Sequence, residues 1–294
     1  MSKYLIKGAS LYGEKVADIL IEDGVISRIA ENIDAADAQV VEAAGQVALP
    51  GLVDIHTHLR QPGYEASETV ETGTRAAALG GYTAVFAMAN SMPVADTAAV
   101  VEQVDRLGKE SAWCRVQPIG AVTVGLKGER LSDIGGMANS TANVRVFSDD
   151  GMCVYDPAVM RRALEYVKTF DGVIAQHAQE PRLTEGAQMN EGKVSADLGL
   201  TGWPAVAEEA IIARDVLLAE HLDSKLHICH LSTKGSIEVV RWAKSRGVKV
   251  TAEATPHHLL LTDETARTYD PIFKVNPPLR TEEDVMALRQ AVAD

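Results

Sequence analysis

The sequence predicts an α/β protein: an incomplete (β/α)₈ barrel of about seven strands at residues 51–294, preceded by a small β layer at residues 1–50. Two observations predict this fold. After residue 51, short apolar runs alternate with longer helical patterns, which is typical of a parallel sheet covered by helices. Acid or imidazole side chains follow four of these runs, and barrels collect their chemistry at the carboxyl ends of strands. An open doubly wound sheet is the structural alternative.

The first 50 residues read as short strands and turns. Apolar runs at 4–8 and 18–24 are each closed by glycine. A third run, 25–29, follows directly after the dipeptide Asp23-Gly24, which is a strong hairpin signal. The turn dipeptide Pro50-Gly51 ends the segment, so we expect a β layer separate from the main fold.

The barrel segment contains seven candidate strands and six candidate helices. The strands are expected at 52–56, 83–89, 116–122, 144–147, 173–177, 226–231 and 248–254. The helices are expected near 67–79, 96–109, 157–169, 205–221, 234–246 and 281–292, with Pro204 close to the start of the fourth. A complete barrel of this kind has eight strands, so the prediction is one strand short.

Composition limits the possible partners and the compartment. The 294 residues carry 28 Lys and Arg against 41 Asp and Glu, a net charge of −13 that argues against nucleic-acid or anionic-membrane partners. No apolar run reaches the length of a membrane span, and the N-terminus does not resemble a secretory signal. Three cysteines without a CxxC pair predict reduced thiols. We therefore expect a soluble, cytoplasmic protein.

A metal site is indicated first by His56 and His58. Residues two apart on a strand point to the same face, so both imidazoles are expected to project into the barrel mouth. Two neutral imidazoles on one side make half of a site for a divalent metal. Taken alone, the pair also fits two surface histidines.

Other strand ends carry matching groups. Asp149 and Asp150 follow the fourth strand, His177 ends the fifth and His230 ends the sixth. A single buried histidine is usually a hydrogen-bonded core residue, but coincidence at four strand ends favours a metal site.

The remaining histidines are weaker candidates. His227 lies three residues before His230, so strand alternation predicts that it faces the opposite way. His257 and His258 follow the seventh strand and could line the site or orient ligands. His221 is expected to be a capping cation at a helix end.

Three further motifs carry a resemblance to a known family. The segment HTHLRQPG at 56–63, the segment MANSMP at 88–93 and the segment NPPLR at 276–280 occur in this order. Together they resemble the signature of the dihydroorotases, a family of the amidohydrolase superfamily of metal-dependent hydrolases. The resemblance covers essentially the whole chain, and the joint occurrence of the motifs is highly specific.

The resemblance implies two zinc ions per subunit. His56 and His58 would hold one, His177 and His230 the other, and Asp150 would bridge them. Many amidohydrolases use a carboxylated lysine as the bridge, whereas the bacterial type I dihydroorotases have an aspartate there. Sequence spacing alone leaves Asp149 as the competing bridge.

The resemblance also implies a substrate and a reaction. His58, Arg60, Asn90 and Asn276 would bind dihydroorotate, whose cyclic amide is reversibly hydrolysed to N-carbamoyl-L-aspartate in pyrimidine (UMP) biosynthesis. The planar guanidinium of Arg60 can pair bidentately with the substrate carboxylate, although a surface salt bridge is the alternative.

The family's catalytic aspartate follows an eighth strand, in a motif resembling D-x-x-A-T-D-H-A-P. Residues 1–294 contain no such motif, so we expect this aspartate beyond Asp294 and the chain to be truncated. Two edges without partners would make such a chain unstable or inactive unless another chain fills the gap.

Rival interpretations remain open. One is another cyclic-amide hydrolase such as an allantoinase or dihydropyrimidinase, which normally has lysine in place of Asp150. The other is an inactive scaffold partner of aspartate transcarbamoylase, although such chains typically lose metal ligands. A homo-oligomer is possible in either case.

Overall fold

The computed structural model describes residues 2–294, which form two compact units. One unit ends at Leu52 and the other begins at Val53.

The N-terminal unit is a five-stranded sheet of order β3-β2-β1-β4, with β5 also paired to β1. Its strands are β1 (Lys3–Leu11), β2 (Lys15–Glu22), β3 (Val25–Ala30), β4 (Gln39–Glu42) and β5 (Val47–Ala48). Asp23 and Gly24 join β2 to β3 with φ values of 49° and 80°, as a type I′ hairpin turn requires. The sequence did not predict β4, whose four residues are all exposed and lack an alternating pattern.

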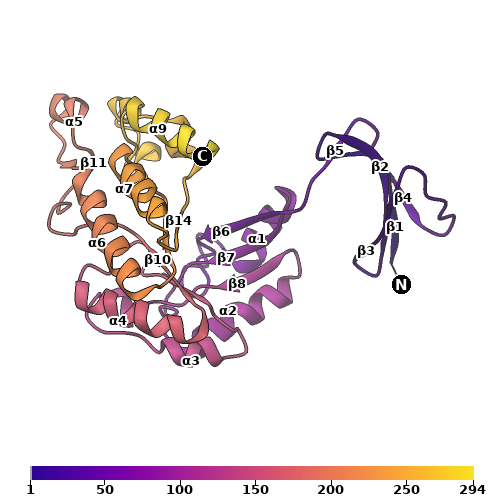
Figure 1. Ribbon diagram of the computed structural model, residues 1–294, viewed down its shortest axis with the longest axis horizontal. Coiled ribbons are helices and arrows are strands. Elements are labelled where there is room, and N and C mark those ends of the chain that lie inside the picture. The colour runs from indigo at the N-terminus through magenta and orange to yellow at the C-terminus, as the bar shows by residue number, and fades with distance from the viewer. Residues whose placement is uncertain (1) are drawn as a thin grey trace. The chain divides into compact units, whose positions relative to one another are not determined.

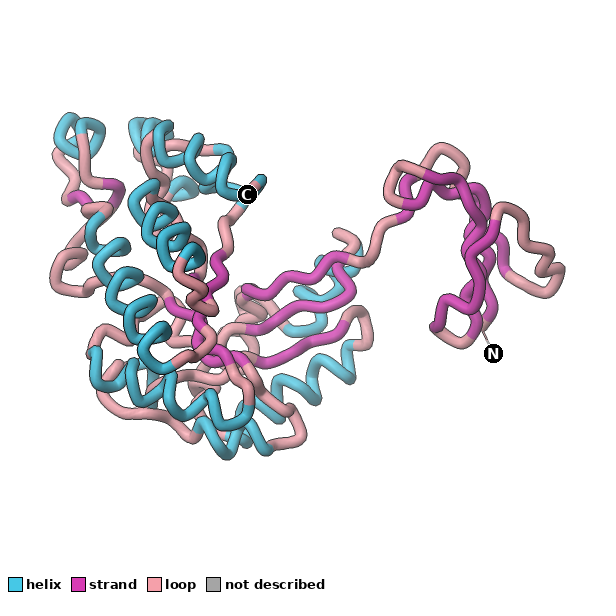
Figure 2. The backbone as a smooth tube through the Cα atoms, viewed as in Figure 1, coloured by secondary structure: helices cyan, strands magenta, loops and turns pink. Residues whose placement is uncertain are grey.

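The second unit contains the seven expected strands in chain order. They are β6 (Leu52–Thr57), β7 (Tyr82–Ala87), β8 (Arg115–Pro118), β9 (Val146–Phe147), β10 (Val173–Gln176), β13 (Leu226–Ile228) and β14 (Val250–Ala252). They form the sheets β6-β7-β8 and β9-β10-β13-β14, whose strands are magenta in Figure 2. A parallel bridge between Gly120, two residues after β8, and Phe147 of β9 joins the two sheets. The pairs β7–β8, β9–β10, β10–β13 and β13–β14 are all parallel. The predicted incomplete barrel is therefore confirmed.

Helices cover the outside of this row of strands (Figure 1). The six expected helices are α1 (Val70–Leu79), α2 (Ala98–Ser111), α4 (Pro157–Val167), α6 (Val206–Leu222), α7 (Lys234–Ser245) and α9 (Glu282–Ala293). Short elements that the sequence did not predict are α3 (Ile134–Asn139), α5 (Lys193–Leu198), α8 (Pro256–Leu260), the 3₁₀ helices η1 (Val124–Leu126), η2 (Lys168–Phe170), η3 (Asp263–Thr268) and η4 (Pro271–Phe273), and the strands β11 (Met189–Asn190) and β12 (Gly202–Trp203). Within residues 2–294, no helix has both the length and the apolar character needed to span a membrane.

Side-chain caps fix where several helices begin. The carboxylate of Asp156 accepts hydrogen bonds from two backbone N–H groups at the start of α4, and Pro157 occupies its first position. Thr281 and Asp284 form a reciprocal capping box at the start of α9. Each cap satisfies amide groups that the helix itself leaves unpaired.

The main core lies between the strands and these helices. Phe147, Ile174 and Ile228 on the strands are fully buried, as are Leu164 of α4 and Ile212 of α6. The strands are thus anchored by apolar contacts on their helical side, which leaves their carboxyl ends to carry polar groups.

A buried polar network holds the segment that follows α8. Arg280 is 1% exposed and donates to Ser232 Oγ (3.0 Å), to Asn190 Oδ1 (3.0 Å) and to the carbonyl of Trp203 (2.9 Å). Its guanidinium also lies 3.8 Å from the buried carboxylate of Glu208. This arginine of the NPPLR motif is therefore a structural tie between β12, α6 and the loop that carries Asn276.

We expect Arg280→Ala to lower the free energy of unfolding by about 3–5 kcal/mol, because it leaves Glu208 buried without its cation. Urea unfolding of the barrel unit measures the change. The matched control is Arg267→Ala, which removes an exposed arginine paired with Asp197 and Glu264 and should cost at most about 1 kcal/mol. Equal losses in the two variants would contradict this account.

Candidate metal centre

A cavity opens at the carboxyl ends of β6, β13 and β14. His56, His58, His230, Glu253, His257 and Asn276 are among its lining residues. Two histidines at the end of β6, His56 and His58, each lie near one oxygen of the same carboxylate. His56 Nε2 lies 3.4 Å from Asp150 Oδ1, and His58 Nε2 lies 3.4 Å from Asp150 Oδ2. Asp150 follows β9 and is 4% exposed.

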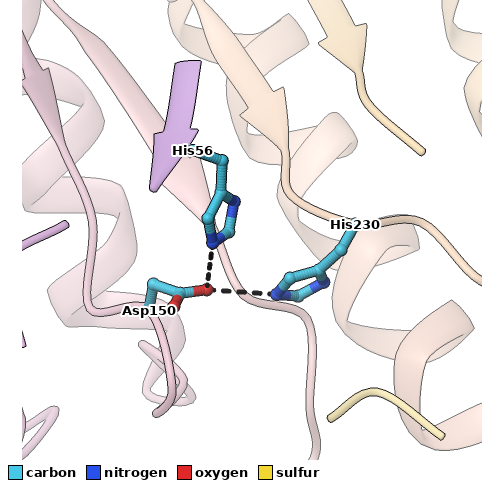
Figure 3. A group of neighbouring side chains, drawn as sticks. All are labelled: His56, Asp150 and His230. Carbon is cyan, nitrogen blue, oxygen red and sulfur yellow. Dashed lines mark hydrogen bonds and ion pairs between the residues drawn. The ribbon is translucent and has the colours of Figure 1, made fainter. Parts of the chain in front are cut away.

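Two more imidazoles reach the same carboxylate from the fifth and sixth strands. His177 Nδ1 lies 3.4 Å and His230 Nε2 lies 3.1 Å from Asp150 Oδ1, and these two ring nitrogens are 2.9 Å apart. Figure 3 shows the rings of His56 and His230 pointing at the oxygen of Asp150 from different strands. Four imidazoles from three strand ends thus converge on one buried carboxylate.

The distances fit a zinc site. With zinc–ligand bonds of about 2.0–2.1 Å and tetrahedral angles, neighbouring ligand atoms lie about 3.3 Å apart. The nitrogen–oxygen separations around Asp150, 3.1–3.4 Å, match this spacing. His56, His177 and His230 face Oδ1, and His58 faces Oδ2. This grouping differs from the expected one, in which His56 and His58 share one metal.

The electrostatics favour a cation at this point. Burial opposes ionisation of Asp150, but hydrogen bonds from His177, His230 and His56 outweigh it and place its pKa well below the usual range. Burial lowers the pKa values of His58 and His230, which keeps these rings neutral and able to ligate. For His56, burial is outweighed by Asp150, Cys229 and Glu253, which together raise its pKa to about 12.

The adjacent carboxylate, Asp149, is engaged elsewhere. It accepts hydrogen bonds from the backbone N–H groups of Val122 (2.8 Å) and Thr123 (2.9 Å) and from the Thr123 hydroxyl. Burial raises its pKa to about 6 even though these hydrogen bonds act in the opposite direction. The geometry therefore separates the two candidates that sequence spacing could not: only Asp150 faces the imidazoles.

Three of the imidazoles also have a partner at their outer ring nitrogen. Asn90 Oδ1 lies 3.0 Å from His58 Nδ1, Gln179 Oε1 lies 2.9 Å from His177 Nε2, and Glu253 Oε1 lies 2.5 Å from His56 Nδ1. Such partners fix which nitrogen carries the proton and how the ring is turned.

Sequence reasoning missed two of these partners and assigned the third to another task. Glu253 directly follows β14, so the strand-end rule that found His177 could have found it. Gln179 lies two residues after His177, and no signal in the sequence singled it out. Asn90 was expected to bind substrate, but its side-chain oxygen contacts His58.

The expectation for His227 is wrong. Strand alternation placed it on the face opposite His230, yet His227 Nε2 lies 3.2 Å from Glu253 Oε2, next to the site. The reason is that β13 ends at Ile228, and His230 lies beyond it with a φ of 31°, so the alternation does not extend that far.

Of the other predicted residues, Asn276 and His257 line the cavity. Arg60 and Asn276 are exposed, and within residues 2–294 Arg60 forms no ion pair. His257 lines the cavity, whereas His258 is buried and donates from Nε2 to the carbonyl of Pro277 (3.1 Å). His258 thereby ties the loop that carries Asn276 to the end of β14.

Two of the sequence motifs pack directly on each other. The Met92 N–H donates to the carbonyl of Pro62 (2.9 Å), and a Cβ at Gly63 would lie 2.3 Å from the Met92 carbonyl oxygen. Gly63 also has a φ of +100°, which disfavours other residues. The close contact explains why the loops after β6 and β7 need both motifs.

Comparison with solved structures finds proteins that share the fold of this chain. A D-hydantoinase crystal structure matches with a TM-score of 0.80 at 20% identity, covering 99% of this chain and 66% of that one. The L-hydantoinase of Arthrobacter aurescens matches with a TM-score of 0.80 at 22% identity, covering 98% of this chain and 66% of that one. At these identities the likeness concerns the fold alone.

Sequence comparison identifies the family. The model for dihydro-orotase-like proteins matches residues 45–236. Proteins named dihydroorotase match from Streptomyces coelicolor (71% identity over 100% of this chain and 69% of the relative), Leifsonia xyli (67%, over 99% and 66%) and Mycobacterium leprae (56%, over 99% and 68%). The chain belongs to the dihydroorotase family, and it spans about two thirds of the length of these relatives.

The two adjacent aspartates give a test of this geometry. We expect Asp150→Asn to abolish or strongly weaken zinc binding, because the buried negative charge between the imidazoles is lost. Asp149→Asn should retain zinc binding but lower the free energy of unfolding by about 1–3 kcal/mol, because its acceptors for Val122 and Thr123 are disturbed. Zinc titration and urea unfolding of both variants measure the two effects. Loss of zinc binding in Asp149→Asn, with zinc binding retained in Asp150→Asn, would contradict this geometry.

Proposed function

We propose that this protein is a zinc-dependent dihydroorotase that binds two zinc ions per chain and hydrolyses the cyclic amide of dihydroorotate, reversibly, to N-carbamoyl-L-aspartate. The observation that carries the proposal is the convergence of His56, His58, His177 and His230 on the Asp150 carboxylate. Family membership supplies the substrate class, because the relatives are named dihydroorotase.

When bound, zinc would lower the pKa of water to near neutrality and polarise the amide carbonyl of the substrate. The chain's own part is to hold the metals and the ring. Both carboxylate oxygens of Asp150 face imidazole nitrogens, which suits a carboxylate that would help to hold the metals. Asn90 and Gln179 keep the protons of His58 and His177 on the outer nitrogens, so the inner nitrogens are free to ligate.

Arg60 is the proposed anchor for the substrate carboxylate. Arg60 is exposed and lies two residues after the candidate ligand His58 in the chain, which supports this role. Asn276 lines the same cavity and can exchange hydrogen bonds with the ring amide. Together they would turn the scissile carbonyl toward the metal that the imidazoles and Asp150 would hold.

Proton transfer to the departing ring nitrogen is assigned by the resemblance to an aspartate whose motif residues 1–294 do not contain. The carboxylates of Asp150 and Glu253 are engaged with imidazoles, which favours their use in holding the site over their use as the proton shuttle. We keep that family aspartate as the proposed general acid–base group.

The test of the function is zinc-dependent hydrolysis of dihydroorotate by purified protein that includes the family aspartate, with bound metal counted in the same sample. We expect two zinc ions per chain and a preference for dihydroorotate over dihydrouracil, hydantoin and allantoin, which lack the ring carboxylate. A preference for one of these neutral rings would replace the proposal with the rival cyclic-amide hydrolase.

Arg60 variants test the carboxylate anchor. We expect Arg60→Ala to raise KM for dihydroorotate by roughly tenfold or more, because a charge-assisted hydrogen bond worth about 1.5–3 kcal/mol is lost. Arg60→Lys should restore only part of the affinity, because lysine lacks the planar fork. The matched control is Arg75→Ala in α1, an exposed arginine near Glu71, which should leave KM unchanged.

Association with aspartate transcarbamoylase and self-association are proposed as further partnerships. The retention of all five candidate ligands supports a catalytic chain over an inactive scaffold. Copurification with aspartate transcarbamoylase and light scattering of the isolated protein test the two partnerships.

A further inference from the structure

The outer partners of the imidazoles differ in charge. His58 and His177 face the neutral amide oxygens of Asn90 and Gln179. His56 alone faces a carboxylate, Glu253, and the 2.5 Å contact between His56 Nδ1 and Glu253 Oε1 is the shortest of the three. An imidazole with a carboxylate partner is a more basic, stronger metal ligand than one with an amide partner. Glu253 therefore has a different effect from Asn90 and Gln179.

The position of Glu253 is fixed from several directions. Its backbone N–H donates to the carbonyl of Ile228 (3.1 Å), and its carbonyl accepts from the N–H of Leu231 (2.9 Å). These bonds hold the end of β14 against the end of β13, and they aim the Glu253 side chain inward. The residue therefore does not depend on a flexible loop for its placement.

The carboxylate of Glu253 touches two candidate ligands that come from different strands. Oε1 contacts His56 Nδ1 and also accepts a hydrogen bond from the backbone N–H of His230 (3.2 Å). His230 has a φ of 31°, which is unfavourable for a residue other than glycine, and the hydrogen bond supports this conformation. One side chain thus sets the ring of His56 and the backbone from which His230 projects.

The second oxygen of Glu253 has a separate partner. Oε2 lies 3.2 Å from His227 Nε2, and His227 Nδ1 lies 2.8 Å from Thr251 Oγ1. Thr251 and His227 therefore form a chain of contacts that ends at Glu253, away from Asp150. The two oxygens can be tested independently, because a change at His227 leaves the contact between Glu253 and His56 in place.

We propose that Glu253 is a positioning residue of the metal centre: it holds the proton of His56 on Nδ1, turns Nε2 toward Asp150 and steadies His230, thereby tightening the binding of a divalent cation. The inference rests on the proposed function, since it requires that a metal occupies the site.

Zinc affinity is the decisive measurement, made on the 294-residue chain by competition with a chelator of known affinity at fixed pH. We expect Glu253→Ala to bind zinc about 10–100-fold less tightly than the unmodified chain. Glu253→Gln keeps an acceptor oxygen but removes the charge, so its zinc affinity should lie between those of Glu253→Ala and the unmodified chain. Circular dichroism and the unfolding midpoint establish that each variant is folded, and the glutamine variant keeps the side-chain shape.

The matched control is His227→Gln, which replaces the imidazole beside Oε2, leaves the contact at Oε1 in place and should bind zinc as tightly as the unmodified chain. A second readout is the tautomer of His56, observed by ¹⁵N NMR of the zinc-loaded protein. We expect the Nδ1–H form in the unmodified chain and a mixture of forms in Glu253→Ala. A purely structural role would leave the tautomer unchanged.

Failure of the positioning role and failure of the proposed function give different results. Unchanged zinc affinity and an unchanged His56 tautomer in Glu253→Ala would overturn the positioning role, as would an equal loss of affinity in His227→Gln. Failure of the unmodified chain to bind zinc would overturn both this inference and the proposed function. Zinc binding that depends on Glu253, without hydrolysis of dihydroorotate, would support the inference and remove only the proposed reaction.

Discussion

The buried carboxylate of Asp150 is the constraint on which the rest of the site depends. A carboxylate that is 4% exposed needs positive charge or hydrogen-bond donors around it, and four imidazoles supply the neighbouring nitrogen atoms. Those imidazoles come from β6, from the end of β10 and from beyond β13. The order of the parallel strands therefore has a direct chemical purpose, because it brings residues 56, 150, 177 and 230 to one edge.

Support for this centre comes from polar groups that touch the imidazoles and not the carboxylate. Asn90, Gln179 and Glu253 each follow a strand of the barrel row, one or more residues beyond its end. The packing of the core on the helical side keeps those strand ends in register. Ligand geometry is therefore determined by backbone pairing and apolar burial at some distance from the metal centre.

The sequence predicted the seven strands, and it brought forward the residues that converge on Asp150, because both follow from local patterns. Apolar runs reveal buried strands, and HxH spacing reveals His56 and His58. It could not separate Asp149 from Asp150, since that choice depends on hydrogen bonds to Val122 and Thr123. His227 was misplaced because the sequence does not show that β13 ends at Ile228. Contacts between distant strands, such as Glu253 with His56, have no local signature.

The wide separation of the ligands along the chain links metal to folding. Residues 56 and 230 meet only when β6 to β13 are assembled, so an unfolded chain offers no comparable site. Zinc that binds only the folded form adds stability by mass action, about 2.7 kcal/mol at a concentration one hundred times its dissociation constant. The amount of correctly folded barrel in a cell would then vary with zinc supply. Zinc starvation would first increase the unfolded fraction that proteases degrade, while the molecules that still hold zinc would keep their turnover rate.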